Sequence, residues 1–207
     1  LLGAHGHTVV PFAMAHPDAA WLRALAAYIA QATDSALDLL SQGGNATGAW
    51  LAGAVPHRGP GGAPARPGMN AAQMLESPRQ AYLLWGIEPD FDVDNPARAL
   101  RALEQAETVI AVASFATDSL RAVADVILPL APHAESEGSL VNFDGDFMPF
   151  AAAGKASGEA RSGWKILRKL GGELAIEGFA QVDLGAVQAD LRRALERGSV
   201  TAAELEL

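Results

Sequence analysis

The sequence predicts an α/β fold, with a mostly parallel sheet flanked by helices, from three observations. Apolar runs of strand length at residues 81–85, 108–113 and 126–128 alternate along the chain with segments of helical periodicity. These runs are apolar at consecutive positions, which is typical of parallel strands covered on both faces. Half of the 207 residues are hydrophobic, which suits a buried core and is too much for a disordered chain.

The first third of the chain predicts helices separated by loops. Pro17 and Asp18 open a helix that ends near Thr33, because apolar residues recur there at helical spacing. Residues 36–40 form an apolar run long enough for a buried strand, and 46–54 a helix of small residues. Four prolines and four glycines in 55–68 predict a loop without regular structure.

The middle of the chain carries clear start and stop signals. Asn70 is placed to cap a short helix that runs through Leu75. Asn95-Pro96 combines a capping side chain with proline at the first helical position, which predicts another helix start. A third short helix is expected at 118–124, and Pro129 ends the strand that follows it.

The periodicity changes after Pro132. Apolar segments 140–143 and 147–150 flank Asp144-Gly145, which predicts a hairpin. Helices are expected at 164–174 and at 184–197, where Gly198 ends the pattern. We therefore expect residues 1–150 to form the α/β body and 151–207 a mainly helical extension packed on it.

Charge and composition exclude several classes of function. Fifteen basic residues face 24 acidic ones, a net charge of -9, so a nucleic-acid partner is not expected. No apolar run approaches the roughly 20 residues that span a bilayer, so direct membrane insertion is not expected either. The absence of cysteine excludes disulfides, thiol catalysis and iron–sulfur clusters held by this chain. The chain opens Leu1-Leu2-Gly3 without a basic region, so we expect a piece of a longer protein rather than a secretory signal.

Three short motifs are weak. The acidic segment 90–95 starts like a calcium loop, but its sixth position is Asn95 and its twelfth is Arg101, where glycine and glutamate are needed. His5-x-His7 has no identifiable third ligand, so stray surface histidines are the simpler interpretation. The glycines of the Pro/Gly loop match neither the Walker phosphate loop nor the dinucleotide fingerprint. We expect no metal site.

A longer pattern is more specific. The sequence has Ala124-Asp125-Val-Ile-Leu-Pro129, then Glu135-Ser-Glu137-Gly138-Ser139, then Asn142-Phe-Asp144-Gly145. Together with Trp85-Gly86-Ile-Glu88-Pro89 and Phe115-Ala-Thr117-Asp118-Ser119, it resembles the molybdopterin-guanine-dinucleotide oxidoreductase superfamily. Over roughly residues 1–180 the chain is similar to the family of large iron–sulfur subunits of bacterial NADH:quinone oxidoreductase, respiratory complex I. The segments that carry this narrower similarity are Ala15-His16-Pro17, Gly43-Gly-Asn45-Ala-Thr-Gly-Ala-Trp50, Gly68-Met-Asn70 and Gly158-Glu159-Ala-Arg161-x-x-Trp164.

The resemblance implies a formate dehydrogenase/DMSO reductase-like, Rossmann-like fold. In that superfamily, loops at the carboxyl ends of parallel strands bind the pterin cofactor. The corresponding residues here form a vestigial cleft in which no cofactor is expected: Gly86, Glu88, Phe115, Thr117, Glu135, Gly138, Asn142 and Gly145. Two departures support this expectation. Asp146 stands where the superfamily has arginine, and Ala113 where active relatives often have a guanine-binding aspartate.

Two functional hypotheses follow from the resemblance. The first is a cofactor-free, non-catalytic structural domain of the complex I peripheral arm, on the cytoplasmic side of the bacterial inner membrane. Its partners would be the rest of its own subunit, which would carry the iron–sulfur clusters, and other peripheral-arm subunits. The alternative is a functional molybdopterin-guanine-dinucleotide-binding part of a molybdenum or tungsten oxidoreductase. An α/β domain unrelated to either family is a third possibility.

Two residues outside these hypotheses have expected structural roles. Gly138 follows Glu137 where strand gives way to hairpin, a position that often needs a positive φ. Trp164 shares a helix face with Arg168, either as an interface patch or, as we favour, as part of the domain core with the arginine lying over it.

Overall fold

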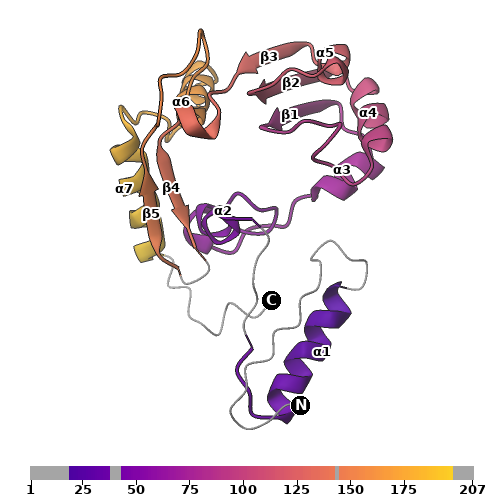
Figure 1. Cartoon of the computed structure of the whole chain (residues 1–207), viewed down its shortest axis with the longest axis vertical. Helices are drawn as coiled ribbons and strands as arrows, with labels where there is room; N and C mark the ends of the chain where they lie inside the picture. Colours follow the sequence, from indigo (N-terminus) through magenta and orange to yellow (C-terminus); the bar gives the residue numbers. More distant parts are fainter. Residues whose placement is uncertain (1–18, 38–42, 143–144, 198–207) are drawn as a thin grey trace.

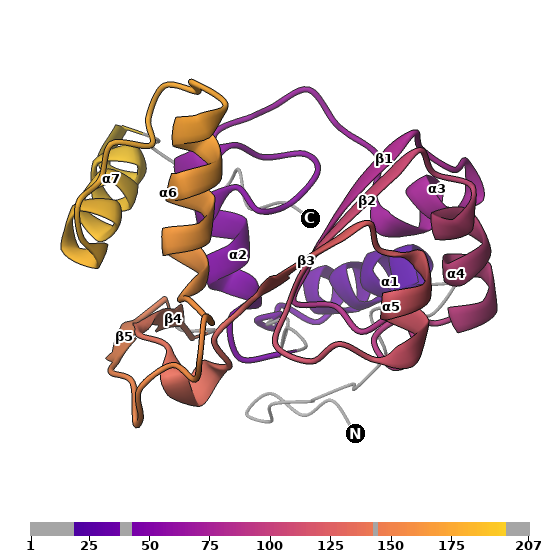
Figure 2. The same ribbon diagram turned by 90° about the horizontal axis from the view of Figure 1, so that it is seen from above.

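The computed structural model describes residues 19–37, 43–142 and 145–197, and one part of its body is a three-stranded parallel sheet (Figure 1). Strands β1 (Ala81–Trp85), β2 (Thr108–Ala113) and β3 (Val126–Pro129) lie in that order, with β2 in the middle. Helices α3 (Ala71–Glu76), α4 (Pro96–Glu104) and α5 (Asp118–Val123) lie together on one side of it (Figure 2). The predicted α/β class is confirmed.

The core lies between β2 and these helices. Val109 and Ala111 point to the same face of the sheet and are almost fully buried, as are Leu103 of α4 and Leu120 of α5. Asp125 sets the register of β3, because its carboxylate accepts a hydrogen bond from Val109 N at 2.7 Å and its own N–H donates to Val109 O at 2.9 Å.

Local signals account for the helix starts. Asn70 caps α3 in a reciprocal pair with Gln73, and Asn95 Oδ1 accepts from Arg98 N at 2.9 Å to cap α4. Thr117 Oγ1 accepts from Leu120 N at the start of α5. Each cap satisfies an N–H that would otherwise have no partner in the first turn.

The rest of the described chain forms a second group of elements, labelled in Figure 1. They are helix α2 (Ala46–Ala52), the 3-10 turns η1 (Pro60–Gly62) and η2 (His133–Glu135), the antiparallel hairpin β4 (Gly138–Val141) and β5 (Phe147–Phe150), and helices α6 (Gly163–Glu173) and α7 (Leu184–Arg197). The predicted hairpin and both predicted carboxyl-terminal helices are confirmed. Helix α1 (Ala19–Ala32) stands apart from the sheet.

Asn45 joins α2 to the hairpin. It precedes the helix, but its side chain makes no cap bond and instead accepts a hydrogen bond from Val141 N at 2.8 Å. The contact requires Gly48, because a Cβ there would lie 2.0 Å from Asn45 Oδ1. Residues 45–48 thus hold the hairpin against α2.

The Pro/Gly loop is more ordered than its composition predicts. Arg58 forms isolated bridges with Val55 and Pro64, and η1 lies within the loop. Gly61 has φ +76°, and a Cβ there would lie 2.4 Å from Ala194 O of α7. Gly61 therefore allows α7 to pack directly on the loop backbone, and both Gly61 and Gly62 are buried.

Some predicted elements are not confirmed. Ala36 and Leu37 lie in irregular chain, and residues 38–40 of the predicted strand lie outside the described residues. The expectations for His5, His7, Pro17, Asp18 and Asp144 also lie outside them. Among the described residues, no helix is both long and apolar enough to cross a bilayer.

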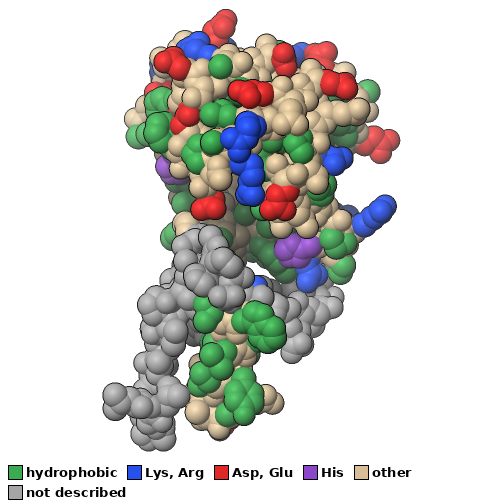
Figure 3. Space-filling model, turned by 90° about the vertical axis from the view of Figure 1, so that its right-hand side faces the viewer, with side chains coloured by type: hydrophobic (Ala, Val, Ile, Leu, Met, Phe, Trp, Pro, Cys, Tyr) green, Lys and Arg blue, Asp and Glu red, His purple; other side chains and the backbone are tan. Residues whose placement is uncertain are grey.

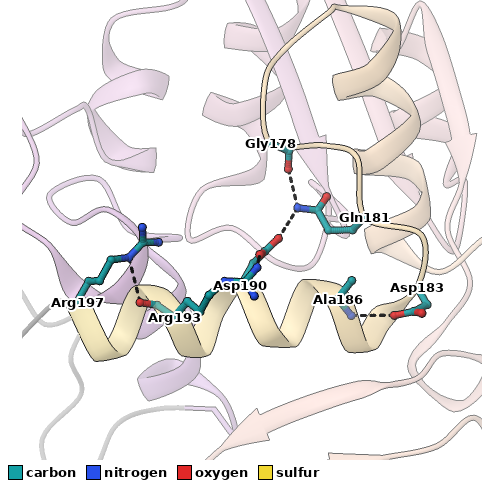
Figure 4. Close-up of polar contacts among 7 residues, drawn as sticks. All are labelled: Gly178, Gln181, Asp183, Ala186, Asp190, Arg193 and Arg197. Atoms are coloured by element: carbon teal, nitrogen blue, oxygen red, sulfur yellow. Dashed lines mark hydrogen bonds and ion pairs between the residues drawn. The ribbon is translucent and has the colours of Figure 1, made fainter.

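A polar network ties α7 to the segment before it (Figure 4). The Gln181 amide donates to Asp190 Oδ2 at 2.6 Å and to Gly178 O at 2.7 Å, and Arg193 pairs with the other Asp190 oxygen. The hydrogen bond from Gln181, followed by the contact with Arg193, lowers the pKa of Asp190. The ionised carboxylate therefore favours the folded state.

We expect the core to be sensitive at Leu120, which is fully buried. Leu120→Ala should lower the free energy of unfolding by about 2–5 kcal/mol, because it leaves a cavity against β2. Urea unfolding measures the change. Leu174→Ala is the matched control, because Leu174 is mostly exposed and its loss should change stability by less than about 0.5 kcal/mol. Equal effects of the two variants would contradict the assigned core.

The Asp190 network predicts a pH dependence. Because the folded-state pKa is lowered, the stabilising contribution is complete above the ordinary aspartate pKa and is lost as pH falls through the folded value. An NMR titration should place the Asp190 midpoint below the ordinary value. Gln181→Ala should raise the Asp190 midpoint, whereas Gln188→Ala, on the helix that carries Asp190, should leave it unchanged. An unchanged midpoint in Gln181→Ala would contradict the network.

Candidate functional site at the carboxyl edge of the sheet

The three parallel strands end together at one edge of the sheet. Trp85, Ala113 and Pro129 are their last residues. Gly86 extends the hydrogen bonding between β1 and β2, since its N–H donates to Val112 O at 2.8 Å. Phe115, which follows β2, has a side chain that is 64% exposed. In open α/β sheets this edge is the usual place for ligands, so it is the candidate site.

The loop after β1 is joined to the loop after β2. Within the first loop, the backbone N–H of Glu88 donates to Asp92 Oδ2 at 2.7 Å, which closes a tight turn. Thr117 Oγ1 donates to Asp90 Oδ2 at 2.9 Å across the edge. The structure therefore brings together four predicted site residues, Gly86, Glu88, Phe115 and Thr117, although the Thr117 hydroxyl is already engaged by Asp90 and by Leu120 N.

The charge at this edge is acidic. Loop 86–95 has four carboxylates, 114–118 has one and 130–137 has two, and no lysine or arginine occurs in any of them. One N–H donor at each helix start is already satisfied, because Arg98 N donates to Asn95 and Leu120 N donates to Thr117. A pyrophosphate needs cations or free N–H groups at a helix start. This donor set does not fit the anionic dinucleotide that the resemblance implies.

A later segment of the chain covers part of the edge. Leu130 forms a parallel bridge with Arg161, and Ala131 N donates to Arg161 O at 2.9 Å. At the start of α6, a Cβ on Gly163 would lie 2.8 Å from the Trp85 ring and 3.5 Å from Leu130. The ends of β1 and β3 therefore pack against residues 161–163. In the sequence, the only sign of this close approach to Trp85 is Gly163, the glycine that precedes Trp164.

The other predicted site residues lie in and around the hairpin. Glu135 accepts a hydrogen bond from Ser157 N at 3.0 Å, which fastens η2 to a later loop. Asn142 closes the hairpin turn, since Asp146 N donates to its Oδ1 at 2.8 Å and Gly145 N to its backbone oxygen at 3.1 Å. The bond from Val141 to Asn45 places this turn beside α2. These side chains serve turns and loop contacts.

The two departures from the superfamily pattern have structural roles. Ala113 is 6% exposed and packs with Ala111 and Leu120, so this position faces the core. Asp146 lies in the hairpin turn, where its carboxylate is 3.4 Å from the Asn142 amide.

Trp164 agrees with the prediction in its burial and Gly138 differs from it. Trp164 is mostly covered and its indole nitrogen is buried, while the cation near its ring is Lys165, with Nζ 5.3 Å from the centroid, where Arg168 was expected. The expectation of a positive φ at Gly138 is wrong, because Gly138 is a residue of β4 without one. The requirement for glycine is steric: a Cβ would lie 2.9 Å from the Phe150 ring.

Gly138→Ala should therefore lower stability by about 1–3 kcal/mol through overpacking. Phe150 also packs against His133, with ring centroids 4.4 Å apart, which restricts its movement. In a double-mutant cycle, Phe150→Leu should remove most of the cost of Gly138→Ala. Thermal unfolding measures both, and strictly additive effects would contradict the steric explanation.

The described residues hold no group of three or more His, Asp or Glu side chains placed to bind a metal ion. The edge offers an acidic surface with one exposed aromatic ring, with Arg161 beside it as a cation from the later segment. Asp90, Asp92 and Glu135 hydrogen-bond within the chain.

Comparison with known proteins adds two findings. The family model described as molybdopterin oxidoreductase matches residues 12–173. NADPH-Fe(3+) oxidoreductase subunit alpha of Geobacter sulfurreducens, from strain DL-1 / KN400 and from strain ATCC 51573 / DSM 12127 / PCA, is 32% identical over 111 residues. That alignment covers 52% of this chain and 13% of the relative, so the chain matches only a small part of that protein's length.

Proposed function

The chain belongs to the molybdopterin oxidoreductase family, and we propose that it is a cofactor-free structural domain of a larger electron-transferring oxidoreductase. The observation that carries this proposal is the carboxyl edge of the sheet. Its three loops are acidic, its helix starts are capped by the chain's own side chains, and residues 161–163 pack against Trp85 and Leu130. An anionic cofactor would meet repulsion and few free donors there.

We propose further that the larger protein is the large iron–sulfur subunit of an NADH:quinone oxidoreductase. The order of the motifs along the chain supports this class, and the relative's name, an NADPH-Fe(3+) oxidoreductase, agrees with a nicotinamide-linked enzyme. Electron transfer would run through clusters elsewhere in the subunit, because this chain has no cysteine to ligate one.

The role of the domain would then be to form contact surfaces with neighbouring domains and subunits and to hold them in position. Its partners would be the rest of its own subunit and other peripheral-arm subunits, on the cytoplasmic side of the bacterial inner membrane. Within the chain, residues 1–150 would form the body and 151–207 an extension packed on it, and the contact of α7 with η1 supports that packing.

Cofactor content tests the structural role. The chain, produced with ample molybdate and tungstate, should contain neither metal nor pterin in stoichiometric amount. Elemental analysis and pterin fluorescence after oxidation measure this, with a cofactor-bearing family member purified in parallel as the control. Stoichiometric molybdenum or tungsten with pterin would overturn the structural role and favour the pterin-binding alternative.

The complex in which the parent protein is found tests whether that protein is a subunit of an NADH:quinone oxidoreductase. When the parent protein is tagged in its own cells, the tag should migrate on native gels within a membrane-associated complex that oxidises NADH. Migration with an activity that does not use NADH would contradict the assignment to this class, while the cofactor result would stand separately.

A further inference from the structure

The three parallel strands are wound in one direction. Along the chain, β1, β2 and β3 follow one another in the order in which they lie in the sheet. The connections between them contain α4 and α5, which both lie on the face that carries Val109 and Ala111. One direction of winding with one covered face is typical of half of a doubly wound sheet. In such sheets the other half continues beyond the first strand, which is β1 here, and its helices cover the opposite face.

The two faces of the sheet agree with this interpretation. Charged side chains of both signs are spread over the side on which α3, α4 and α5 lie, as on a surface that meets water (Figure 3). The opposite face is covered near Val112, which is fully buried, but Leu83 is 53% exposed and Val126 44% exposed there. Because parallel sheets are normally covered on both faces, this face is incomplete in the described residues.

The outer edge of β1 carries backbone groups that can pair with another strand. Gly86 N donates to Val112 O, so Gly86 and every second residue before it face β2. Ala81, Leu83 and Trp85 therefore point their N–H and C=O groups away from β2. None of these groups forms a hydrogen bond with another residue in the described part of the chain.

The two edges of the sheet differ in how they are protected. At the end of β3, Pro129 has no N–H, and Arg161 N donates to Pro129 O at 3.1 Å, so a later segment already lies along that edge. β1 contains neither a proline nor a charged residue, which are the features by which natural proteins block edge pairing. The edge that can accept a further strand is therefore that of β1.

We propose that a strand of the parent polypeptide, from outside these 207 residues, pairs in parallel with the outer edge of β1. This inference rests on the proposed function as a domain of a larger protein. The relative, of whose length this chain matches 13%, has ample further chain for such a strand. The occupant is a strand because an extended backbone pairs with N–H and C=O groups at alternate residues. The helix connected to it would cover Leu83 and Val126.

Hydrogen exchange of the parent polypeptide, with fragmentation that resolves single amides, tests the pairing. The amides of Leu83 and Trp85 should exchange at least about 100-fold more slowly than in an unstructured peptide, as should the Leu84 amide that faces β2. In the 207-residue chain alone, Leu83 and Trp85 should exchange rapidly while Leu84 stays protected. Rapid exchange at Leu83 and Trp85 in the parent would overturn the proposal. Equal protection in the chain alone would also overturn it, because the chain itself or a second copy would then cover the edge.

Two proline variants of the parent polypeptide distinguish the two edges. Leu83→Pro removes an N–H from the outer edge of β1, and Val126→Pro removes one from the outer edge of β3, and neither N–H faces β2. Leu83→Pro should make the Trp85 amide exchange rapidly, whereas Val126→Pro should leave it protected. Protection retained at Leu84 shows that the sheet is intact. Loss of Trp85 protection in both variants, or in neither, would overturn the pairing.

These results are independent of the tests of the proposed function. A parent protein that carries pterin, or that belongs to a complex that does not oxidise NADH, would overturn the proposed function without changing either exchange pattern.

Discussion

The pairing of β2 with both of its neighbours is the interaction on which the other elements depend. β2 supplies the most deeply buried residues of the sheet, and α4 and α5 pack on it through Leu103 and Leu120. Asp125 adds directional control, because its paired bonds with Val109 allow only one alignment of β3. The positions of the loops at the carboxyl edge follow from that alignment.

The carboxyl edge of the sheet has the backbone geometry of a ligand site, but its side chains are acidic and several of them bond to one another. The strands end together and a glycine follows β1, as in dinucleotide-binding folds. Several polar groups there are engaged locally: Thr117 with Asp90, Asp92 with the Glu88 backbone, and one N–H at each helix start with its cap. The core and the edge loops are stabilised by different residues, so the loops can change without disturbing the fold.

Local patterns predicted most elements, because their determinants lie within a few residues. The apolar runs at 81–85 and 108–113 became strands with the same bounds, and Asn95-Pro96 started a helix as expected. The candidate site was predicted only in part. Gly86 and Thr117 do come together, but Asn142 and Gly145 lie in a turn beside α2. Their position depends on the contact of Asn45 with Val141, which no local pattern indicates. Gly138 was misjudged for the same reason, since its constraint comes from Phe150 across the hairpin.

The way α2 and the Pro/Gly loop are held has a consequence for synthesis. Asn45 is fixed by Val141, and Gly61 lies against Ala194, so residues 45–62 are completed by parts of the chain made much later. Contacts of such long sequence separation are slow to close. We expect the segment to emerge from the ribosome early, remain without its native neighbours while the sheet is being made, and reach its final packing only when α7 is released.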